Sequence, residues 1–180
     1  YGRVISGPEV HADADIWVQA MWELRSRLVK RFGYNEGRRR VAQLMIDAMK
    51  RAPANASYVD MRDALVAADR ANHAGEDVNA IWEAFARRGL GYMAATNNGA
   101  SVRVLPSQDL PSPLGKVRFF ESVYYDGEPL RIYVGDENNP DASVSLRVET
   151  SSGDRETLAL PRAGSTYRVT LTPAAGALAP

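Results

Sequence analysis

Apolar residues recur every three or four positions along the first half of the chain. Over residues 11–32 this spacing predicts one long amphipathic helix, which ends at Gly33. Its apolar stripe consists of Ile16, Trp17, Ala20, Met21, Leu24 and Leu28. A second stripe over residues 41–49 predicts another helix that closes before Pro53, with the basic run 38–40 at its solvated start.

Two further helices are predicted before residue 91. Ser57, followed three residues later by Asp60, resembles a capping box with Asp in place of Glu, and it opens a third helix that runs to about Ala71. Asp77 can cap a fourth helix, which Gly89 ends. The aromatic residues expected in the core of this half are Trp17, Trp22, Trp82 and Phe85.

After Gly91 the pattern changes from a helical period to alternation. Residues 96–115 contain Asn97-Asn98-Gly99 and three prolines, which is typical of an interdomain linker. Beyond it, short segments rich in β-forming residues are separated by turn signals. The predicted strands are 117–125, 130–134, 143–150, 156–160 and 166–172. Strands at this spacing, with no helix between them, favour a small β-sandwich.

These patterns together predict an α+β protein built as two units. The N-terminal unit is expected to be an all-α helical subdomain and the C-terminal unit an all-β sandwich. The expected boundaries are a helical unit over 1–95, a linker over 96–115, a β-sandwich over 116–174 and a tail over 175–180.

Composition narrows the class of protein without identifying it. Of the 180 residues, 45% are hydrophobic and 24% are charged, which is the profile of a globular protein. The formal net charge is zero, which argues against a general nucleic-acid surface, and no apolar run has the length of a membrane span. The absence of cysteine fits a cytosolic protein or an exported protein that is stable without disulfides. Because the first residue is Tyr and no signal-peptide pattern follows, we expect the sequence to begin within a longer protein.

The sequence contains no complete catalytic centre. Its two histidines, His11 and His73, are not at metal-ligand spacing, and zinc HExxH, Gly-x-Ser-x-Gly and phosphate-loop motifs are absent. His11 is the candidate catalytic residue, because it lies at the entrance to the first helix among the acidic residues Glu9, Asp13 and Asp15. Such neighbours can orient and charge an imidazole that donates a hydrogen bond to an oxyanion in an adjacent cleft. A structural or surface histidine is the alternative that the residues leave open.

Two other polar clusters have both a functional and a structural interpretation. Asp60, Arg62 and Asp63 could belong to an active site, although adjacent acids and bases on a helix more often form an ion-pair network. The segment 136–141 gathers oxygen ligands suited to calcium in one loop. It lacks the EF-hand pattern, so a hydrogen-bonded turn is the preferred interpretation.

Four segments of the first half resemble the fungalysin family of zinc metallopeptidases, and they occur in the family's order. Val10-His11-Ala12-x-Ala14-Asp15-Ile16-Trp17 is similar to the family's His-Ala-x-Gly-Glu-x-Trp, with Ala14 and Asp15 in place of Gly and Glu. Ile81-Trp82-Glu83-Ala84-Phe85-Ala86-Arg87-Arg88-Gly89-Leu90-Gly91 is similar to Ile-Trp-x-Ala-Phe-Ala-x-Arg-Gly-Met-Gly. The other two segments are 43–50 and 58–69. Pro53-Ala54 stands where the family has Pro-Cys, so that disulfide is absent.

This resemblance implies a thermolysin-like, gluzincin fold, of which residues 1–95 would be the C-terminal helical half. The zinc ligands would lie upstream of Tyr1, in the same precursor or in a companion chain, and His11 would match the family's oxyanion-binding histidine. In such enzymes zinc polarises the scissile carbonyl of a protein or peptide substrate, and a Glu takes a proton from the metal-bound water. This chain alone would be inactive.

The function predicted on these grounds is that of the C-terminal portion of a secreted zinc endopeptidase. A non-catalytic extracellular scaffold, built from a degenerate peptidase half and a β-sandwich, is the alternative, and an upstream HExxH would decide between them. The predicted strands resemble β-sandwich modules of secreted bacterial proteins, and arginine outnumbers lysine 19 to 3, which fits a host of high genomic GC. We therefore expect a secreted or cell-surface protein of bacterial origin.

Overall fold

A computed structural model describes residues 10–96, 104–112, 114–125, 127–149, 151 and 153–172. The helices are α1 (Val10–Phe32), α2 (Tyr34–Met49), α3 (Tyr58–Asn72) and α4 (Val78–Ala86). The strands are β1 (Ala95–Thr96), β2 (Val104–Leu105), β3 (Lys116–Phe119), β4 (Leu130–Gly135), β5 (Ser143–Glu149), β6 (Arg155–Ala163) and β7 (Thr166–Leu171). The fold is therefore mixed α+β, as predicted. Glu9, Asn97-Asn98-Gly99 and the tail 175–180 lie outside the described residues.

By internal packing the chain divides into two compact units, Tyr1–Leu110 and Pro111–Pro180. The first unit holds the four helices and also a short antiparallel hairpin of β1 and β2. It is therefore not all-helical, because residues that were expected to belong to a linker add strand β2 to it.

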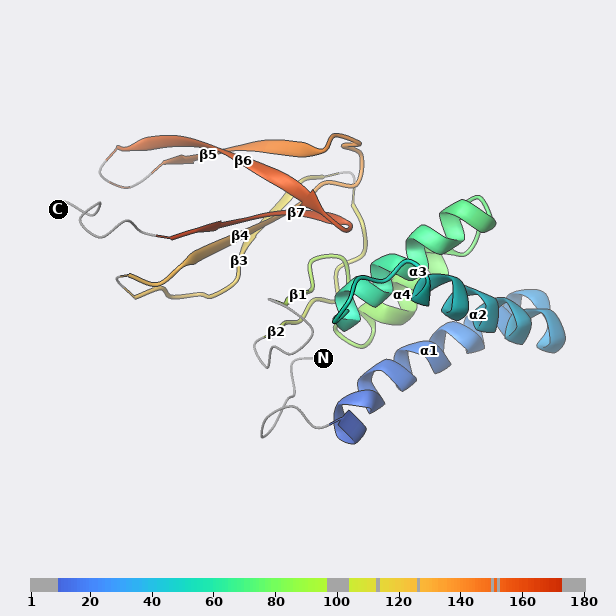
Figure 1. Ribbon diagram of the computed structural model, residues 1–180. Coiled ribbons are helices and arrows are strands. Elements are labelled where there is room, and N and C mark those ends of the chain that lie inside the picture. The colour runs from blue at the N-terminus through green and yellow to red at the C-terminus, as the bar shows by residue number, and fades with distance from the viewer. Residues whose placement is uncertain are drawn as a thin grey trace. The chain divides into compact units, whose positions relative to one another are not determined.

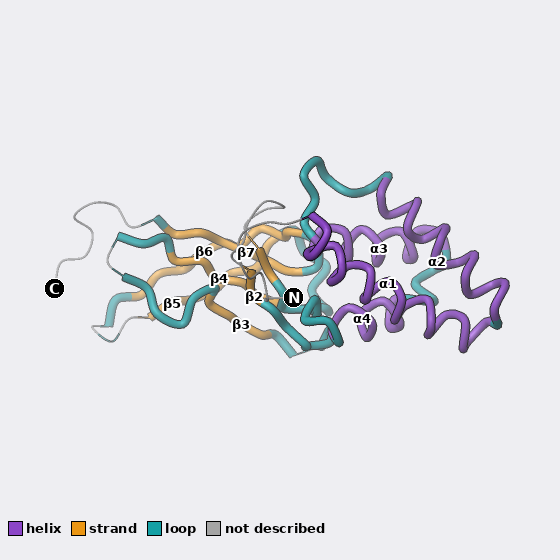
Figure 2. Tube along the Cα trace, turned by 90° about the horizontal axis from the view of Figure 1, so that it is seen from below, coloured by secondary structure: helices purple, strands orange, loops and turns teal. Residues whose placement is uncertain are grey.

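The four helices of the first unit pack mainly in a ring, in which α1 and α3 each lie against both α2 and α4 (Figures 1 and 2). In α1 the core positions Ala20, Leu24 and Leu28 repeat every four residues and are completely buried. Trp17 joins this core, because its ring lies 5.9 Å from that of Tyr58 in α3 and 5.4 Å from that of Phe85 in α4. One face of α1 thus contacts residues of both α3 and α4.

Trp22 is not part of this core, although the sequence predicted it there. Its side chain is 59% exposed, and the guanidinium of Arg25 lies 4.9 Å from the centre of its ring. Two residues beyond Ala20, Trp22 is turned about 200° around the helix and so faces away from the buried stripe.

The contact between α1 and α2 is close at Gly37. A Cβ at this glycine would lie 2.4 Å from the backbone nitrogen of Val29, so only hydrogen fits between the two helices. Gly33 ends α1 with a left-handed φ of +80°, and α2 begins at the next residue. This is earlier than the predicted start near residue 38, because the first turn of α2 is polar and adds nothing to the apolar stripe.

The side-chain cap that the sequence predicts is present at the start of α3 and absent at the start of α4. Asp60 donates its backbone N–H to the Ser57 hydroxyl at 3.2 Å, and its carboxylate accepts the Ser57 N–H at 2.9 Å, so the predicted capping box is present. Asp77 makes no capping hydrogen bond with its side chain. Its buried carboxylate instead pairs with Arg40 of α2 at 3.1 Å and with Arg31 of α1 at 3.5 Å.

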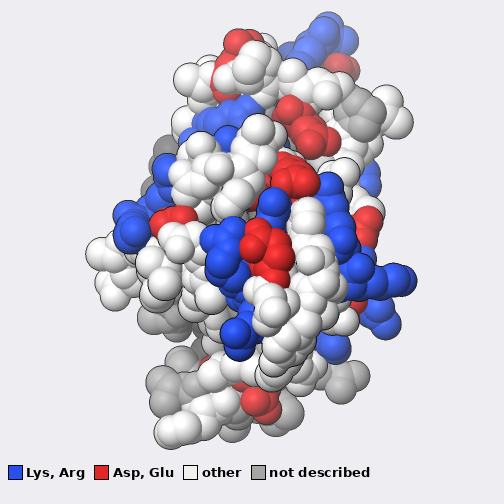
Figure 3. All heavy atoms as spheres, turned by 90° about the vertical axis from the view of Figure 1, so that its right-hand side faces the viewer, with Lys and Arg blue, Asp and Glu red and all other residues white. Residues whose placement is uncertain are grey.

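Arg40 lies at the centre of an ion-pair network that joins helix ends. It donates to Glu36 at 3.1 Å and to Glu76 at 2.7 Å, in addition to its bond with Asp77. On the face that Figure 3 shows, acidic and basic side chains lie next to one another. Hydrogen bonds from Arg39 and Arg40 lower the pKa of Glu36 from 4.5 to about 2.

The second unit is one antiparallel sheet with the strand order β3-β4-β7-β6-β5. Most of β6 pairs with β5, and only its last two residues, Arg162 and Ala163, pair with β7. The sheet therefore curls, and the β5–β6 hairpin lies over β4 and β7 (Figure 1). The buried residues between the two layers are Ile132, Val134, Leu160 and Tyr167. This is a single curled sheet, and the predicted β-sandwich is not confirmed.

The acidic loop between β4 and β5 forms a hydrogen-bonded turn. The hydroxyl of Tyr167 lies 2.8 Å from the Asn139 carbonyl oxygen, and Arg162 donates to the Asp141 carbonyl at 3.2 Å. The Asn139 side chain also accepts the Asp141 N–H at 2.9 Å. The backbone carbonyls of Asn139 and Asp141 and the Asn139 side chain thus have protein partners.

Replacing Glu36 by Gln should flatten the acid limb of the stability curve. Because the folded-state pKa of Glu36 is lowered to about 2, its ion pairs stabilise the fold above pH 4.5 and are lost as the pH falls toward 2. Urea unfolding at several pH values between 2 and 5 measures how the free energy of unfolding changes with pH. This change should be smaller for Glu36→Gln than for Glu156→Gln, a control variant on β6. Equal changes would contradict the role of this network.

Candidate functional site

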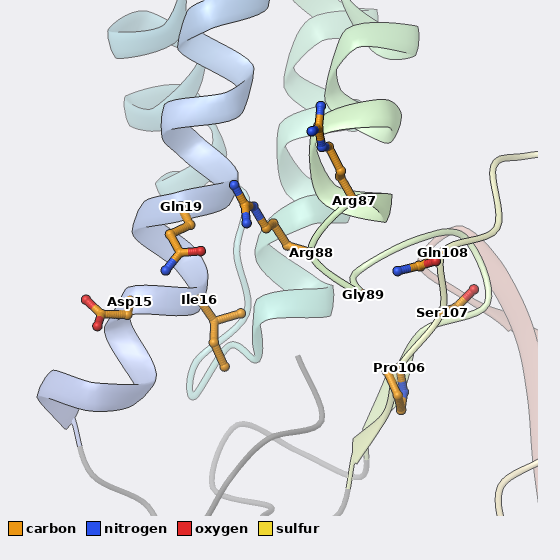
Figure 4. A pocket seen from close by; sticks show the side chains of 9 residues that line it. All are labelled: Asp15, Ile16, Gln19, Arg87, Arg88, Gly89, Pro106, Ser107 and Gln108. Carbon is orange, nitrogen blue, oxygen red and sulfur yellow. The ribbon is translucent and has the colours of Figure 1, made fainter.

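The first unit contains a cleft of about 690 Å³ between the start of α1, the end of α4 and the loop after β2 (Figure 4). Its volume lies in the range of roughly 300–1,000 Å³ that ligand sites occupy. The lining residues are Asp15, Ile16, Gln19, Arg87, Arg88, Gly89, Pro106, Ser107 and Gln108. The α1 residues are about 70 to 90 positions from the other lining residues in sequence, so the cleft exists only in the folded chain.

Gly89 shapes the α4 side of the cleft. Its φ of +78° turns the chain sharply out of the helix. The Gly89 N–H donates to the Ala86 carbonyl at 3.0 Å, and the Leu90 N–H donates to the Phe85 carbonyl at 2.9 Å. This is the hydrogen-bond pattern of a glycine-terminated helix, as the sequence predicted at this position.

The loop after β2 is bonded directly to the chain that leaves α4. Ser107 donates its N–H to the Gly89 carbonyl at 2.8 Å and accepts the Gly91 N–H at 2.7 Å. The Tyr92 N–H donates to the Asp109 carbonyl at 2.7 Å. At Gly91 a Cβ would lie 2.4 Å from the Asp109 carbonyl oxygen, so the close approach requires glycine. The predicted linker is here a fixed wall of the cleft.

Arg62 stabilises this wall by hydrogen bonds to its backbone. Its side chain is completely buried and donates to the carbonyls of Leu90 at 3.0 Å and Gly91 at 2.6 Å. It also pairs with Asp63 at 2.7 Å, and its guanidinium lies 4.6 Å from the centre of the Trp82 ring. With Asp60 in the capping box of α3, the cluster that was considered for catalysis is structural.

His11 lies on the exposed first turn of α1. It precedes Asp15 by four residues, so the two residues share one side of the helix about 6 Å apart along its axis. Asp15 is among the residues that line the cleft, and His11 is not. The assignment of His11 as a site residue therefore rests on the resemblance of residues 10–17 to the family motif.

His73 lies in the turn that follows α3. It ends α3, and its side chain is only 18% exposed, with Nδ1 lying 3.3 Å from the Asp69 carboxylate. Asp69 is completely buried, which raises its pKa, and it accepts the Asp77 N–H at 2.9 Å. His73 therefore belongs to the turn between α3 and α4 and does not line the cleft.

The cleft residues that sequence reasoning missed are polar. No sequence pattern marks Gln19 as a site residue, because it falls outside the apolar stripe of α1. Arg87 and Arg88 belong to a segment that resembles the family, but nothing in that resemblance marks them as site residues. Ser107 lay in the predicted linker, and its place in the cleft depends on backbone pairing that no local pattern shows.

The described residues do not form a metal centre. No three His, Cys, Asp or Glu side chains among them gather as ligands. His11 and His73 lie at the start of α1 and at the end of α3, respectively. The residues described here therefore do not fit a zinc site. Among the same residues, no helix has the length and hydrophobicity needed to cross a bilayer.

The four-helix unit carries the sequence of a peptidase family. Residues 1–94 match the model of the fungalysin metallopeptidase family (M36), and the chain belongs to this family. The match covers α1 to α4 and ends at the residue before β1. The resemblance found in the four sequence segments is thereby confirmed at the level of the family.

Curated relatives of the chain are fungal proteins. Extracellular metalloproteinase 10 of Coccidioides posadasii is 33% identical over 115 residues, which are 56% of this chain and 18% of the relative. Extracellular metalloproteinase mep of Aspergillus flavus is 32% identical over 118 residues, 58% of this chain and 18% of the relative. Extracellular metalloproteinase 3 of Arthroderma gypseum is 35% identical over 107 residues, 52% of this chain and 17% of the relative. The aligned part thus spans less than a fifth of each relative.

The prediction of a bacterial source was wrong. These relatives come from fungi and are named extracellular metalloproteinases, so they support a fungal origin. An arginine-rich composition reports only on base composition, and it cannot distinguish a bacterial host from a fungal one.

Replacing Arg62 by Met should destabilise the first unit by about 3–5 kcal/mol, because it leaves the Leu90 and Gly91 carbonyls and Asp63 without a buried partner. Chemical denaturation measures the loss, and hydrogen exchange should show reduced protection of the Gly91 and Tyr92 amides. Arg70→Met, an exposed change on the same helix, should stay within about 0.5 kcal/mol of wild type. Similar stability for both variants would show that Arg62 does not hold the wall.

Proposed function

We propose that this chain is the C-terminal portion of a secreted zinc endopeptidase that hydrolyses peptide bonds in protein substrates. Membership of the fungalysin metallopeptidase family supports this proposal, as do relatives that are named extracellular metalloproteinases. The helices over residues 1–95 would be the C-terminal half of a thermolysin-like catalytic domain.

The zinc ligands of this enzyme would lie outside the chain. A family of metallopeptidases needs a metal, and the described residues offer no ligand set for one. We therefore assign the zinc motif to an upstream segment of the same precursor or to a companion chain. This chain would be inactive without that partner.

The second unit would serve a role other than catalysis. Its sheet lies beyond the residues that match the family, and its acidic loop is closed by hydrogen bonds to Tyr167 and Arg162. We propose that residues 116–174 form a β-sandwich-type module that spaces or tethers the peptidase. The chain between the two modules would be the linker 96–115, shortened by the residues that pack as β2 and the cleft wall.

Within the enzyme, we propose that His11 stabilises the transition state. The observation that carries this role is its exposed position on the first turn of α1, one turn from the cleft residue Asp15. An imidazole N–H in this position would donate a hydrogen bond to the oxyanion that forms when the scissile carbonyl is attacked. Such a bond is stronger in the transition state than in the ground state, so it accelerates the reaction.

Replacing His11 by Ala in the complete protein should therefore lower kcat by about 10²–10³. Zinc content should stay at the wild-type level and KM should change little, because His11 neither binds the metal nor holds the substrate in the ground state. Steady-state peptide cleavage and metal analysis measure the two effects. Lys30→Ala, an exposed change on the last turn of the same helix, is the matched control and should retain the wild-type rate.

Two outcomes would contradict this assignment. Equal rates for His11→Ala and wild type would return His11 to a surface role. No cleavage of any peptide by the zinc-loaded complete protein would favour the non-catalytic scaffold instead.

A further inference from the structure

The cleft has one strongly basic side. Arg87 and Arg88, at the end of α4, face α1, which contributes the amide of Gln19 and one carboxylate, that of Asp15. In Figure 4 the Asp15 side chain points away from both arginines. The interior of the cleft therefore presents guanidinium and amide donors to a ligand, with its acidic group turned outward.

The two arginines differ in where their side chains go. Arg87 is 67% exposed and pairs with Glu23 of α1 at 3.3 Å, along the helices and away from the loop. Arg88 is half-buried and extends across the cleft toward Gln19 (Figure 4). Arg88 is thus the guanidinium that a ligand lying in the cleft would meet.

The exposed amides of Gln19 and Gln108 stand on opposite walls of the same cleft. A carboxamide both donates and accepts, so the pair suits the N–H and C=O groups of an extended peptide backbone. A guanidinium suits a carboxylate, to which it donates two parallel hydrogen bonds. Together these groups describe a peptide that carries a carboxylate.

We propose that the cleft is a substrate subsite in which Arg88 binds a carboxylate of the peptide. The carboxylate is either an acidic side chain or the C-terminal carboxylate of the substrate. This inference rests on the proposed function, since it takes the ligand to be a peptide that is cleaved beside His11.

The helix geometry also places this subsite along the substrate. Gln19, which faces Arg88, follows His11 by eight residues, or about 12 Å along α1. An extended peptide advances about 3.3 Å per residue, so 12 Å corresponds to three or four residues. The preferred carboxylate should therefore lie about three or four residues from the scissile bond.

The test uses the zinc-loaded complete protein and matched peptides. Each pair carries Glu or Gln at one position, scanned over four residues on either side of the scissile bond. A second pair ends in a free carboxylate or in an amide three residues after the bond, which distinguishes the two sources of the charge. We expect kcat/KM to be about tenfold higher for the charged member at three or four residues.

Arg88→Gln should bring this ratio to about one, and Arg88→Lys should retain part of it. Arg51→Gln, an exposed change after α2 that does not line the cleft, is the control and should keep the wild-type ratio. Thermal unfolding of each variant shows whether it is folded. As a comparison that needs no variant, the α-amide of N-acetylglutamate, which has one carboxylate, should inhibit peptide cleavage by wild type better than the α-amide of N-acetylglutamine, which has none.

The outcomes separate this inference from the proposed function. Equal cleavage of the Glu and Gln peptides at every position by wild type would overturn the subsite and leave the peptidase intact. A wild-type ratio that persists in Arg88→Gln would also overturn it. If the complete protein cleaves no peptide, the proposed function fails. Fluorescence anisotropy of the same labelled peptides then decides the subsite, because tighter binding of the Glu peptide, lost in Arg88→Gln, supports it and equal binding overturns it.

Discussion

A single buried cation fixes the part of the first unit on which the cleft depends. Arg62 has no access to water, so its guanidinium must be satisfied by protein oxygens, and it takes them from Leu90, Gly91 and Asp63. The chain leaving α4 is thereby held against α3, in position to pair with the loop around Ser107. The positions of both the α4 side and the loop side of the cleft depend on these hydrogen bonds of Arg62. The side chains that face a ligand are placed by a residue that does not itself face it.

Sequence reasoning succeeded where structure is set by neighbours in the chain. The end of α1 at Gly33, the capping box at Ser57 and the turn at Gly89 each depend on a few adjacent residues, and strands β4, β5 and β7 follow from local alternation. Apolar spacing was less reliable for single residues, as exposed Trp22 shows. It failed for the loop at Ser107 and for the curl of the sheet at Ala163, because both depend on backbone pairing between segments that carry no local signal.

Only part of the candidate site could be predicted from the sequence. His11 was found because its neighbours resemble a family motif, and the structure adds that it is exposed one turn from a cleft. Gln19, Arg88 and Gln108 became candidates only when tertiary packing brought them together. The proposed function implies that this chain would supply one side of a substrate cleft and an oxyanion donor, while another segment would hold the metal. Such an arrangement would account for a member of a metallopeptidase family that has no ligand set among its described residues.

Zinc stoichiometry tests this arrangement most directly. Metal analysis after exhaustive dialysis would be made on the complete protein and, separately, on the chain of residues 1–180. The account predicts one tightly held zinc per molecule of the complete protein, retained in His11→Ala, and no stoichiometric zinc on the 180-residue chain. One tightly bound zinc on the 180-residue chain that is lost in His11→Ala would contradict it, because His11 would then be a metal ligand and the metal would belong to this chain.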